Sequence, residues 1–574
     1  MNSFRKLAGV FQSETRLRNL KLVTAGAAIG LIVWRLQFST RSICCGDYDG
    51  YYHFMWSRLM WEGFRSHHWR PTFIWLPLTT LNPRDYVDHH WLFHVFQIPF
   101  TWFRDLRLGA KVASTIFASL AIFSCFWLLV RYRIRYALVW LIALLACSAP
   151  FLYRINMAKA PPFAIIYLIL GIYFLFQKKY WPLLPLGFVF TLTYDMFVLL
   201  IGAAFIWVVV MGWAERSFEW RPIVWVLLGT AAGAVINPYF PHNLFLFYEH
   251  LKIKLTLNDF TTKVGGEWYP YSTWEFLGNS LVACAAMLAG YIAFDPSDRK
   301  HSHHSLFFLI LSSMLMLMTA RWRRIAEYWP PFAIIFAAFA LQPWLAGARS
   351  IFVHLPADVL DELQPFLDRH DPPEIRKAQQ TKELLQIIGA SIVAGVLGTA
   401  LVVNFPSLHL QGVLPVTIKD IGNSDPPNYY KAGTEWVRAN VPRGEIIFNT
   451  DWDDFPRLFF FDPTHRYVSG LDPTYLYDQN AALSKLYDRI TLGEENDPGP
   501  LIRDRFGARY VFTDNSSDHT KFSTKAMDSG WFEIAYEDKD CTVLHILDQK
   551  KPVPPGQTEP DTNDDTEDGD DNGG

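Results

Sequence analysis

The strongest constraint on this 574-residue chain is a series of apolar runs, most of them about as long as a helix that crosses a lipid bilayer. The runs cover approximately 20–37, 110–130, 136–150, 161–177, 182–194, 195–213, 222–237, 274–294, 304–320, 325–344 and 384–404. Hydrophobic residues make up 51% of the chain, which includes 22 Trp and 45 Phe, and this is too apolar for a soluble protein. The sequence therefore predicts a polytopic α-helical membrane protein with about eleven spans, a count that the shorter runs leave open by one or two.

Short basic clusters between the runs predict the orientation. If the N-terminus is cytoplasmic, the loops "RYRIR", "QKK", "ERSFEWR" and "DRKHSHH" all fall on the cytoplasmic side, as the positive-inside tendency requires. The same assignment places 38–109, 151–160, 238–273 and everything after 405 outside, which means the periplasm if the protein is bacterial. The net charge of −3 and the scattered basic residues indicate no nucleic-acid partner.

The composition changes near residue 405, which divides the chain. Residues 1–404 are predicted to form the membrane domain, with a long outer loop at 38–109 and a cytoplasmic insert at 345–383. Residues 405–550 alternate helix-like stretches with short strands such as "EIIF", "RYVFT", "FEIAYE" and "TVLHIL". This pattern predicts an extracytoplasmic α/β domain. The acidic tail, 551–574, lacks apolar residues and is predicted to be disordered.

Ionisable residues gather in the outer loops. The stretch "DYDGYYH" places Asp47 and Asp49 directly after the first run, where two carboxylates suit a divalent cation or the deprotonation of a nucleophile. His89, His90 and His94 in "DHHWLFH" could be metal ligands, but an interfacial helix also favours His and Trp. Asp195 lies between two apolar runs, where a charge has a functional role by default. We expect the tyrosines near Asp49, together with Trp56, to form an interfacial wall suited to a sugar.

A basic group on the outer side contradicts the positive-inside tendency. The group is "RWRR", with Arg321, Arg323 and Arg324 at the start of a run. Such arginines either bind an anionic ligand or extend toward lipid headgroups.

Four stretches together resemble the integral-membrane glycosyltransferases of the GT-C class. They are "DYDGYYH", "VGGEWYPYSTW" (264–274), "RWRRIAEYWPPFAIIFAA" (321–338) and "NTDWDDF" (449–455). Within that class the sequence is most similar to the catalytic subunit of oligosaccharyltransferase. The resemblance implies transfer of a sugar or oligosaccharide from a polyprenyl-phosphate-linked donor to a protein, lipid or glycan acceptor on the outer face of the membrane.

The resemblance also implies roles for particular residues. Asp47, Asp49 and Glu267 match the family's catalytic acids, and Arg323 or Arg324, beside Arg321, matches the arginine near the donor phosphate. Trp452 and Asp453 match its acceptor-binding motif, although "DF" stands where the family has a tyrosine and a glycine. In the oligosaccharyltransferase branch the resemblance implies a divalent cation, Mn²⁺ or Mg²⁺, at Asp47 and Asp49. His89, His90 or Asp195 would supply the further ligands of such a site in this sequence.

One departure from the family opens an alternative. The loop "APFLYRINMAKAPPF" contains Arg154 and Lys159 where the family has a second acidic motif. The second hypothesis is therefore a metal-independent GT-C enzyme that transfers a monosaccharide to a lipid or polysaccharide acceptor. A hypothesis of another class is a membrane transporter, because Asp195 between two short runs also suits a broken span.

Overall fold

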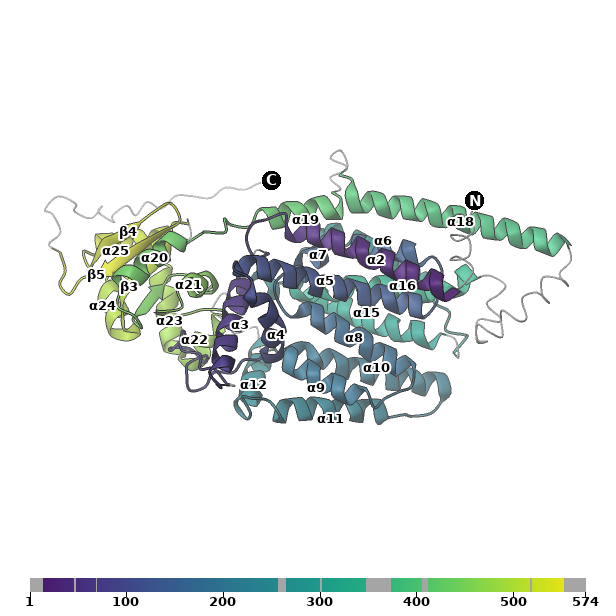
Figure 1. Ribbon diagram of the computed structural model, residues 1–574, viewed down its shortest axis with the longest axis horizontal. Coiled ribbons are helices and arrows are strands. Elements are labelled where there is room, and N and C mark those ends of the chain that lie inside the picture. Colours follow the sequence, from purple (N-terminus) through teal and green to yellow (C-terminus); the bar gives the residue numbers. More distant parts are fainter. Residues whose placement is uncertain are drawn as a thin grey trace, which may run out of the picture.

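A computed structural model of the protein describes residues 14–45, 48–68, 70–255, 265–299, 302–346, 373–404, 411–516 and 519–551. It consists of a long helical bundle and, at one end of the bundle, a smaller domain built on a β-sheet (Figure 1). Residues 347–372 of the predicted cytoplasmic insert lie outside the described residues, as does the acidic tail after residue 551.

A helix lies at each of the eleven predicted apolar runs. These helices are α2 (Glu14–Gln37), α5 (Leu106–Arg131), α6 (Ala137–Ala146), α8 (Pro161–Phe176), α9 (Leu183–Thr193), α10 (Val198–Glu215), α11 (Arg221–Val235), α14 (Leu281–Ala293), α15 (His303–Arg321), α16 (Trp329–Ala346) and α18 (Pro373–Val402). In the described residues five helical segments are long and apolar enough to cross a membrane. The number is up to seven if α6 with α7 (Ala149–Ile155), and α13 (Thr273–Asn279) with α14, each form one bent span. The prediction of a polytopic helical membrane protein agrees with this bundle, whereas eleven spans stay a prediction.

Close helix packing in the bundle depends on a glycine. A Cβ atom at Gly229 of α11 would lie 2.2 Å from the carbonyl oxygen of Leu184 in α9. Because only hydrogen fits there, the two backbones approach closely, as small residues allow between membrane helices.

Short helices connect the spans at the end of the bundle that faces the sheet domain (Figure 1). They are α3 (Asp49–Arg65), α4 (Trp91–Gln97), η1 (Ile98–Trp102), α7, η2 (Asp195–Phe197), α12 (His242–Leu255), η3 (Gly266–Trp268), α13 and η4 (Arg323–Glu327). The loops predicted to be cytoplasmic lie together at the other end. Tyr132 contacts His304 there, with ring centroids 5.3 Å apart, and Arg135 donates to the carbonyl of Leu345.

The C-terminal part contains a five-stranded sheet in the order β2-β1-β3-β5-β4. The strands are β1 (Ile446–Asn449), β2 (Arg466–Tyr467), β3 (Ala508–Asp514), β4 (Phe532–Glu537) and β5 (Cys541–Ile546). β1 is parallel to β2 and β3, whereas β5 is antiparallel to β3 and β4. The helices of this part are α19 (Val413–Gly422), α20 (Lys431–Asn440), α21 (Phe455–Phe461), α22 (Thr474–Gln479), α23 (Ala481–Thr491), α24 (Pro498–Leu501), η7 (Ile502–Phe506) and α25 (Thr520–Asp528).

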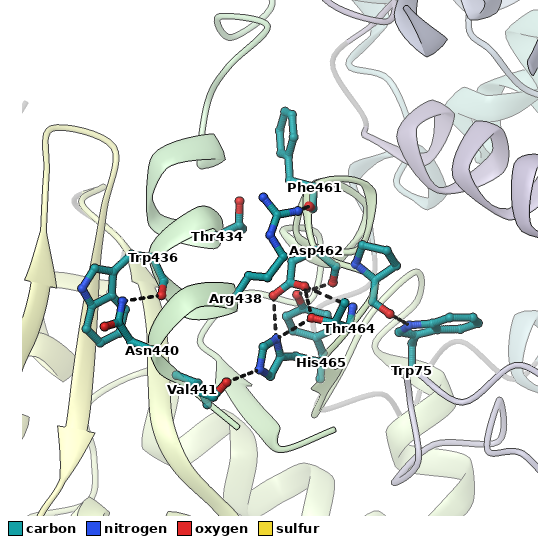
Figure 2. A network of polar contacts seen from close by, with 12 residues as sticks. Trp75, Thr434, Trp436, Arg438, Asn440, Val441, Phe461, Asp462, Thr464 and His465 are labelled. Carbon is teal, nitrogen blue, oxygen red and sulfur yellow. Dashed lines mark hydrogen bonds and ion pairs between the residues drawn. The ribbon is translucent and has the colours of Figure 1, made fainter. Parts of the chain in front are cut away.

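The first outer loop and the sheet domain share one aromatic core. Trp75 packs edge-on against Phe459 of α21 at 4.9 Å, and its indole N–H donates to the carbonyl of Pro463 at 2.7 Å (Figure 2). Buried Arg457 lies over the ring of Tyr48, 4.0 Å from its centroid. Aromatic pairs of this kind contribute about 0.5–1.5 kcal/mol each beyond the area they bury. The shared core therefore holds the sheet domain against the start of α3.

Candidate active site

A cavity of about 340 Å³ lies where the bundle meets the sheet domain. Its wall combines the start of α3, the turn before α4, η2, η3 and η4 with the segment before and within α22. Met196, Val198 and Met318, at the ends of α10 and α15, make one part of the wall apolar. The cavity thus joins an apolar surface at the membrane helices to a group of charged side chains.

Asp49 lines this cavity and pairs with Lys159, whose Nζ lies 2.7 Å from Oδ2 of the carboxylate. Asp49 is in the first turn of α3, where the helix dipole favours a negative charge. A Cβ atom at Gly50 would lie 2.9 Å from Cβ of Ala158, so the glycine allows α3 to begin against the segment that carries Lys159. Asp47, the other predicted catalytic acid of this loop, lies outside the described residues.

Glu267 is placed between two arginines. Its Oε2 accepts a hydrogen bond from Arg154 at 2.7 Å, and its Oε1 lies 3.2 Å from Nη1 of Arg324. Burial alone would raise the pKa of Glu267, but the charges of Arg324 and Arg154 outweigh it and hold the pKa well below its usual range. Arg154 also donates from Nε to buried Glu327 at 2.8 Å. Glu267 is therefore ionised, and it belongs to a network in which two arginines face two glutamates.

The structure separates the three arginines of "RWRR". Arg324 lines the cavity, donates to the hydroxyl of Tyr194 at 3.0 Å and lies over the ring of Trp268. Arg323 is not part of the cavity wall and pairs with Glu275 at 3.2 Å. Arg321, the last residue of α15, is exposed. Among the three, Arg324 alone is positioned to meet a ligand in the cavity.

All four predicted metal ligands, Asp49, His89, His90 and Asp195, line the cavity. Across the described ranges, however, no three His, Cys, Asp or Glu side chains are arranged so that they could hold a metal ion. Asp47, a further candidate ligand, lies outside the described residues. The cation stays a prediction, and no step of the proposed reaction depends on it.

A buried chain of hydrogen bonds runs from α4 to the cavity wall. Nδ1 of His94 lies 2.7 Å from Oδ2 of Asp88, and Nε2 of His94 lies 2.7 Å from Nδ1 of His53. Burial alone would raise the pKa of Asp88, but His94 and the indole N–H of Trp56 outweigh it and lower the pKa. Burial lowers the pKa of His53. The chain thus begins at a carboxylate and ends at a neutral imidazole that lines the cavity.

The aromatic residues after Asp49 do not form the predicted sugar-binding wall. Tyr51, Tyr52 and Trp56 are buried in the protein core, and none of them lines the cavity. Their large apolar rings are stabilised by packing on the shared aromatic core rather than by contact with a ligand. The aromatic side chains of the cavity wall include Tyr194, Trp268 and Tyr475 instead.

The predicted acceptor-binding residues lie beside the cavity, not in its wall. Trp452 and Asp453 follow β1, and the backbone N–H of Asp453 donates to Asp451 at 3.1 Å. A Cβ atom at Gly265 would lie 3.9 Å from the ring of Trp452, so the ring is next to the segment that carries Glu267. The sheet domain contributes Leu471, Asp472 and Tyr475 to the wall.

Several site residues had no role in the sequence-based prediction. In the sequence, Lys159 stands out only because it lies where the family has an acidic motif. Glu327 lies inside an apolar run that was predicted to be a span. An acid within such a run is itself a signal of function, and this signal could have identified Glu327. The partnership of His53, His94 and Asp88 had no signal, because it depends on the packing of α3 against α4.

Comparisons with known proteins agree with this geometry at the level of the fold. No protein-family model matches the sequence, and no curated protein matches it. The structure, in contrast, is similar to solved glycosyltransferases. The crystal structure of the Archaeoglobus fulgidus oligosaccharyltransferase, tethered to an acceptor peptide with an NVT sequon, is 11% identical; the alignment covers 92% of this chain and 74% of that one, with a TM-score of 0.53.

Two other solved structures have the same architecture. The arabinofuranosyltransferase AftD from mycobacteria is 13% identical over 92% of this chain and 40% of its own length, with a TM-score of 0.52. ArnT from Cupriavidus metallidurans, crystallised with undecaprenyl phosphate, is 14% identical over 92% of this chain and 99% of its own, with a TM-score of 0.51. The chain therefore has the same fold as these solved glycosyltransferases, which confirms the fold that the resemblance predicts.

Proposed function

We propose that this protein is a glycosyltransferase that moves a sugar or oligosaccharide from a polyprenyl-phosphate-linked donor to an acceptor on the outer face of the membrane. The observation that carries the proposal is the composition of one cavity wall. It joins an apolar surface at the ends of α10 and α15 to the guanidinium of Arg324 and the carboxylate of Asp49. A donor with a lipid tail, a phosphate and a sugar needs these three environments side by side. The shared fold with ArnT, which was crystallised with undecaprenyl phosphate, supports the donor class.

The phosphate of the donor would bind Arg324. Breaking the anomeric C–O bond leaves negative charge on that phosphate, and a guanidinium stabilises it through charge-assisted hydrogen bonds. In the structure Arg324 pairs with one carboxylate oxygen of Glu267, and Arg154 donates a hydrogen bond to the other. A phosphate could therefore replace Glu267 at Arg324 while Glu267 keeps its bond to Arg154.

Asp49 would act on the acceptor. A carboxylate in the cavity can take the proton of the attacking group, and general-base assistance of this kind contributes about 10²–10⁴ in rate. The ammonium of Lys159, 2.7 Å away, fixes the position of the carboxylate. Asp47 is the second candidate for the role, by its resemblance to the family motif.

One form of the proposal is metal-independent transfer of a monosaccharide to a lipid or polysaccharide acceptor. The predicted metal ligands do not converge among the described residues, and Trp452 and Asp453 are not part of the cavity wall. An oligosaccharyltransferase-like reaction with a peptide acceptor is the alternative, supported by the fold shared with the Archaeoglobus enzyme.

The test uses proteoliposomes that contain the full chain, polyprenyl-phosphate-linked sugars as donors, and peptide and glycolipid acceptors. We expect sugar transfer by the wild type and a loss of about 10²-fold or more in Asp49→Asn. Glu62→Gln is the matched control, because Glu62 lies on the same helix but is exposed and pairs only with Arg58 in the described residues. Undiminished transfer by Asp49→Asn would refute the role of Asp49, and uptake of solute without transfer would favour the transporter.

A further inference from the structure

The chain of hydrogen bonds from Asp88 to His53 ends at the cavity, next to Asp49. His53 follows Asp49 by four residues on α3, so the two side chains lie on one face of the helix, one turn apart. Both residues line the cavity. A substrate group that reaches Asp49 is therefore within reach of His53 as well.

The direction of the hydrogen bonds determines what His53 presents to the cavity. Ionised Asp88 can only accept, so Nδ1 of His94 donates to it at 2.7 Å. The single proton of a neutral His53 can be on Nδ1, and Nε2 of His94 then accepts it at 2.7 Å. The remaining nitrogen of His53, Nε2, then carries a lone pair, and it has no hydrogen-bond partner in the part of the chain that the structure describes.

The partners of Asp88 keep this arrangement in place. Besides His94, the carboxylate accepts the indole N–H of Trp56 at 2.9 Å and the backbone N–H of His90 at 3.0 Å. Asp88, His94 and Trp56 are almost completely buried. A carboxylate that receives three donors is fixed in orientation, and it selects the tautomer of the imidazole that it faces.

We propose that Nε2 of His53 accepts a hydrogen bond from an O–H or N–H group of the glycosyl acceptor and holds that group beside Asp49. The proposal rests on the glycosyltransferase function proposed above and adds a specific acceptor-binding residue to it. His94 and Asp88 act through His53, as positioning residues that keep its Nε2 an acceptor. A site built to receive such a hydrogen bond discriminates against an acceptor that lacks the donor group.

Two substitutions of His53 separate this role from a structural one. In His53→Asn the amide nitrogen can take the place of Nδ1 and donate to His94, but nothing takes the place of Nε2. In His53→Gln the amide oxygen can take the place of Nε2 and accept a hydrogen bond in the cavity, but the bond to His94 is lost. The first variant thus keeps the internal contact, and the second keeps the cavity contact.

The experiment measures transfer in proteoliposomes from polyprenyl-phosphate-linked monosaccharides to octyl glycosides, together with thermal unfolding of each variant. We expect His53→Asn to unfold near the wild-type temperature and to lose about 10- to 100-fold in kcat/KM for the octyl glycoside, with a smaller change in KM for the donor. We expect His53→Gln to unfold at a lower temperature but to retain a higher kcat/KM than His53→Asn.

The reverse order of the two variants, with His53→Asn fully active, would overturn the role of His53 and leave a structural contact between α3 and α4. Sugar transfer by the wild type with an unchanged kcat/KM in His53→Asn would overturn this inference but leave the proposed function in place. A wild type that transfers no lipid-linked sugar would overturn the proposed function and this inference with it.

Discussion

At the scale of single residues, two adjacent arginines have different environments. Arg324 is partly buried against Tyr194 and Glu267, with 17% of its side chain exposed, whereas 38% of the Arg323 side chain is exposed beside Glu275. The turn of η4 sends the two side chains in different directions, so only Arg324 reaches the cavity.

Substitution of these arginines tests the donor-binding role. We expect Arg324→Ala to cost about 2–4 kcal/mol in transition-state stabilisation, because a preorganised charged donor is lost where charge develops. The loss should affect kcat more than KM for the lipid-linked donor, since the phosphate becomes more negative as the bond breaks. Arg323→Ala is the matched control and should retain most turnover. Equal effects of the two substitutions in steady-state kinetics would contradict the assignment.

At the scale of elements, helices α9 and α11 approach each other through small residues. Gly229→Ala would place a Cβ atom 2.2 Å from the backbone oxygen of Leu184, and backbone cannot yield as a flexible side chain can. We expect a destabilisation of about 1–3 kcal/mol, visible as a lower temperature of thermal inactivation in detergent. Gly202→Ala in α10 is the control, because no atom lies within 4 Å of the added Cβ. A variant at Gly229 as stable as that control would show that the helices can separate at no cost.

The segment between α21 and β2 contains a second buried pair, which predicts a dependence of stability on pH. Nδ1 of His465 lies 2.6 Å from Oδ2 of Asp462, and Nε2 lies 3.2 Å from the carbonyl of Val441 (Figure 2). Burial would lower the pKa of His465, but the hydrogen bond and charge of Asp462 outweigh it and raise the pKa. In Asp462 the bonds from His465 and Thr464 outweigh burial and lower the pKa.

The sign of the pH dependence follows from these shifts. Folding raises the pKa of His465. Its contribution to the free energy of unfolding is therefore complete below about pH 6.5 and is lost as the pH rises through the folded pKa. Folding lowers the pKa of Asp462. Its contribution to the free energy of unfolding is therefore complete above about pH 4 and is lost as the pH falls through the folded pKa. We expect the unfolding temperature to decrease from pH 6.5 to 8.5 in the wild type and less so in His465→Gln, measured by intrinsic fluorescence. Parallel curves for the two proteins would exclude the pair as the cause.

At the scale of the whole molecule, the two ends of the bundle differ in chemistry. The loops predicted to be cytoplasmic meet at one end, where Lys178 pairs with Glu215 and Arg299 lies over Trp213. The sheet domain lies at the other end (Figure 1). The residues that line the cavity come from the connecting segments at that end and from the sheet domain. A single membrane orientation therefore places the loops predicted to be cytoplasmic on one side and the residues of the cavity wall on the other.

Cysteine labelling tests this orientation. Glu62 and Lys178 are about half exposed, at 51% and 48% of their side chains, and they lie at opposite ends. In a variant without native cysteines we expect an impermeant thiol reagent to modify Glu62→Cys from outside the cell and Lys178→Cys only after the membrane is made permeable. Modification of both positions from the same side would contradict the topology.

The sequence alone determined the class of the molecule and the position of its elements. Apolar runs of membrane length predict helices because a bilayer leaves no other way to satisfy the backbone, and a helix lies at each of these runs in the structure. The strands predicted from "EIIF", "RYVFT", "FEIAYE" and "TVLHIL" are β1, β3, β4 and β5, shifted by one residue at most at either end. These features are local, since they depend on the period and length of apolar residues along the chain.

The tertiary structure decided which of the candidate residues meet. Asp49 and Lys159 are 110 positions apart in the sequence, and Arg154, Glu267 and Arg324 come from three different connecting segments. Their pairing depends on how the helices pack at one end of the bundle, which no local pattern encodes. Trp56 shows the reverse case: its sequence position suggested a ligand contact, but the packing of the outer loop against the sheet domain buries it and directs its N–H to Asp88. Local pattern therefore fixed the elements of this protein, whereas long-range packing decided the charges and hydrogen bonds of its site.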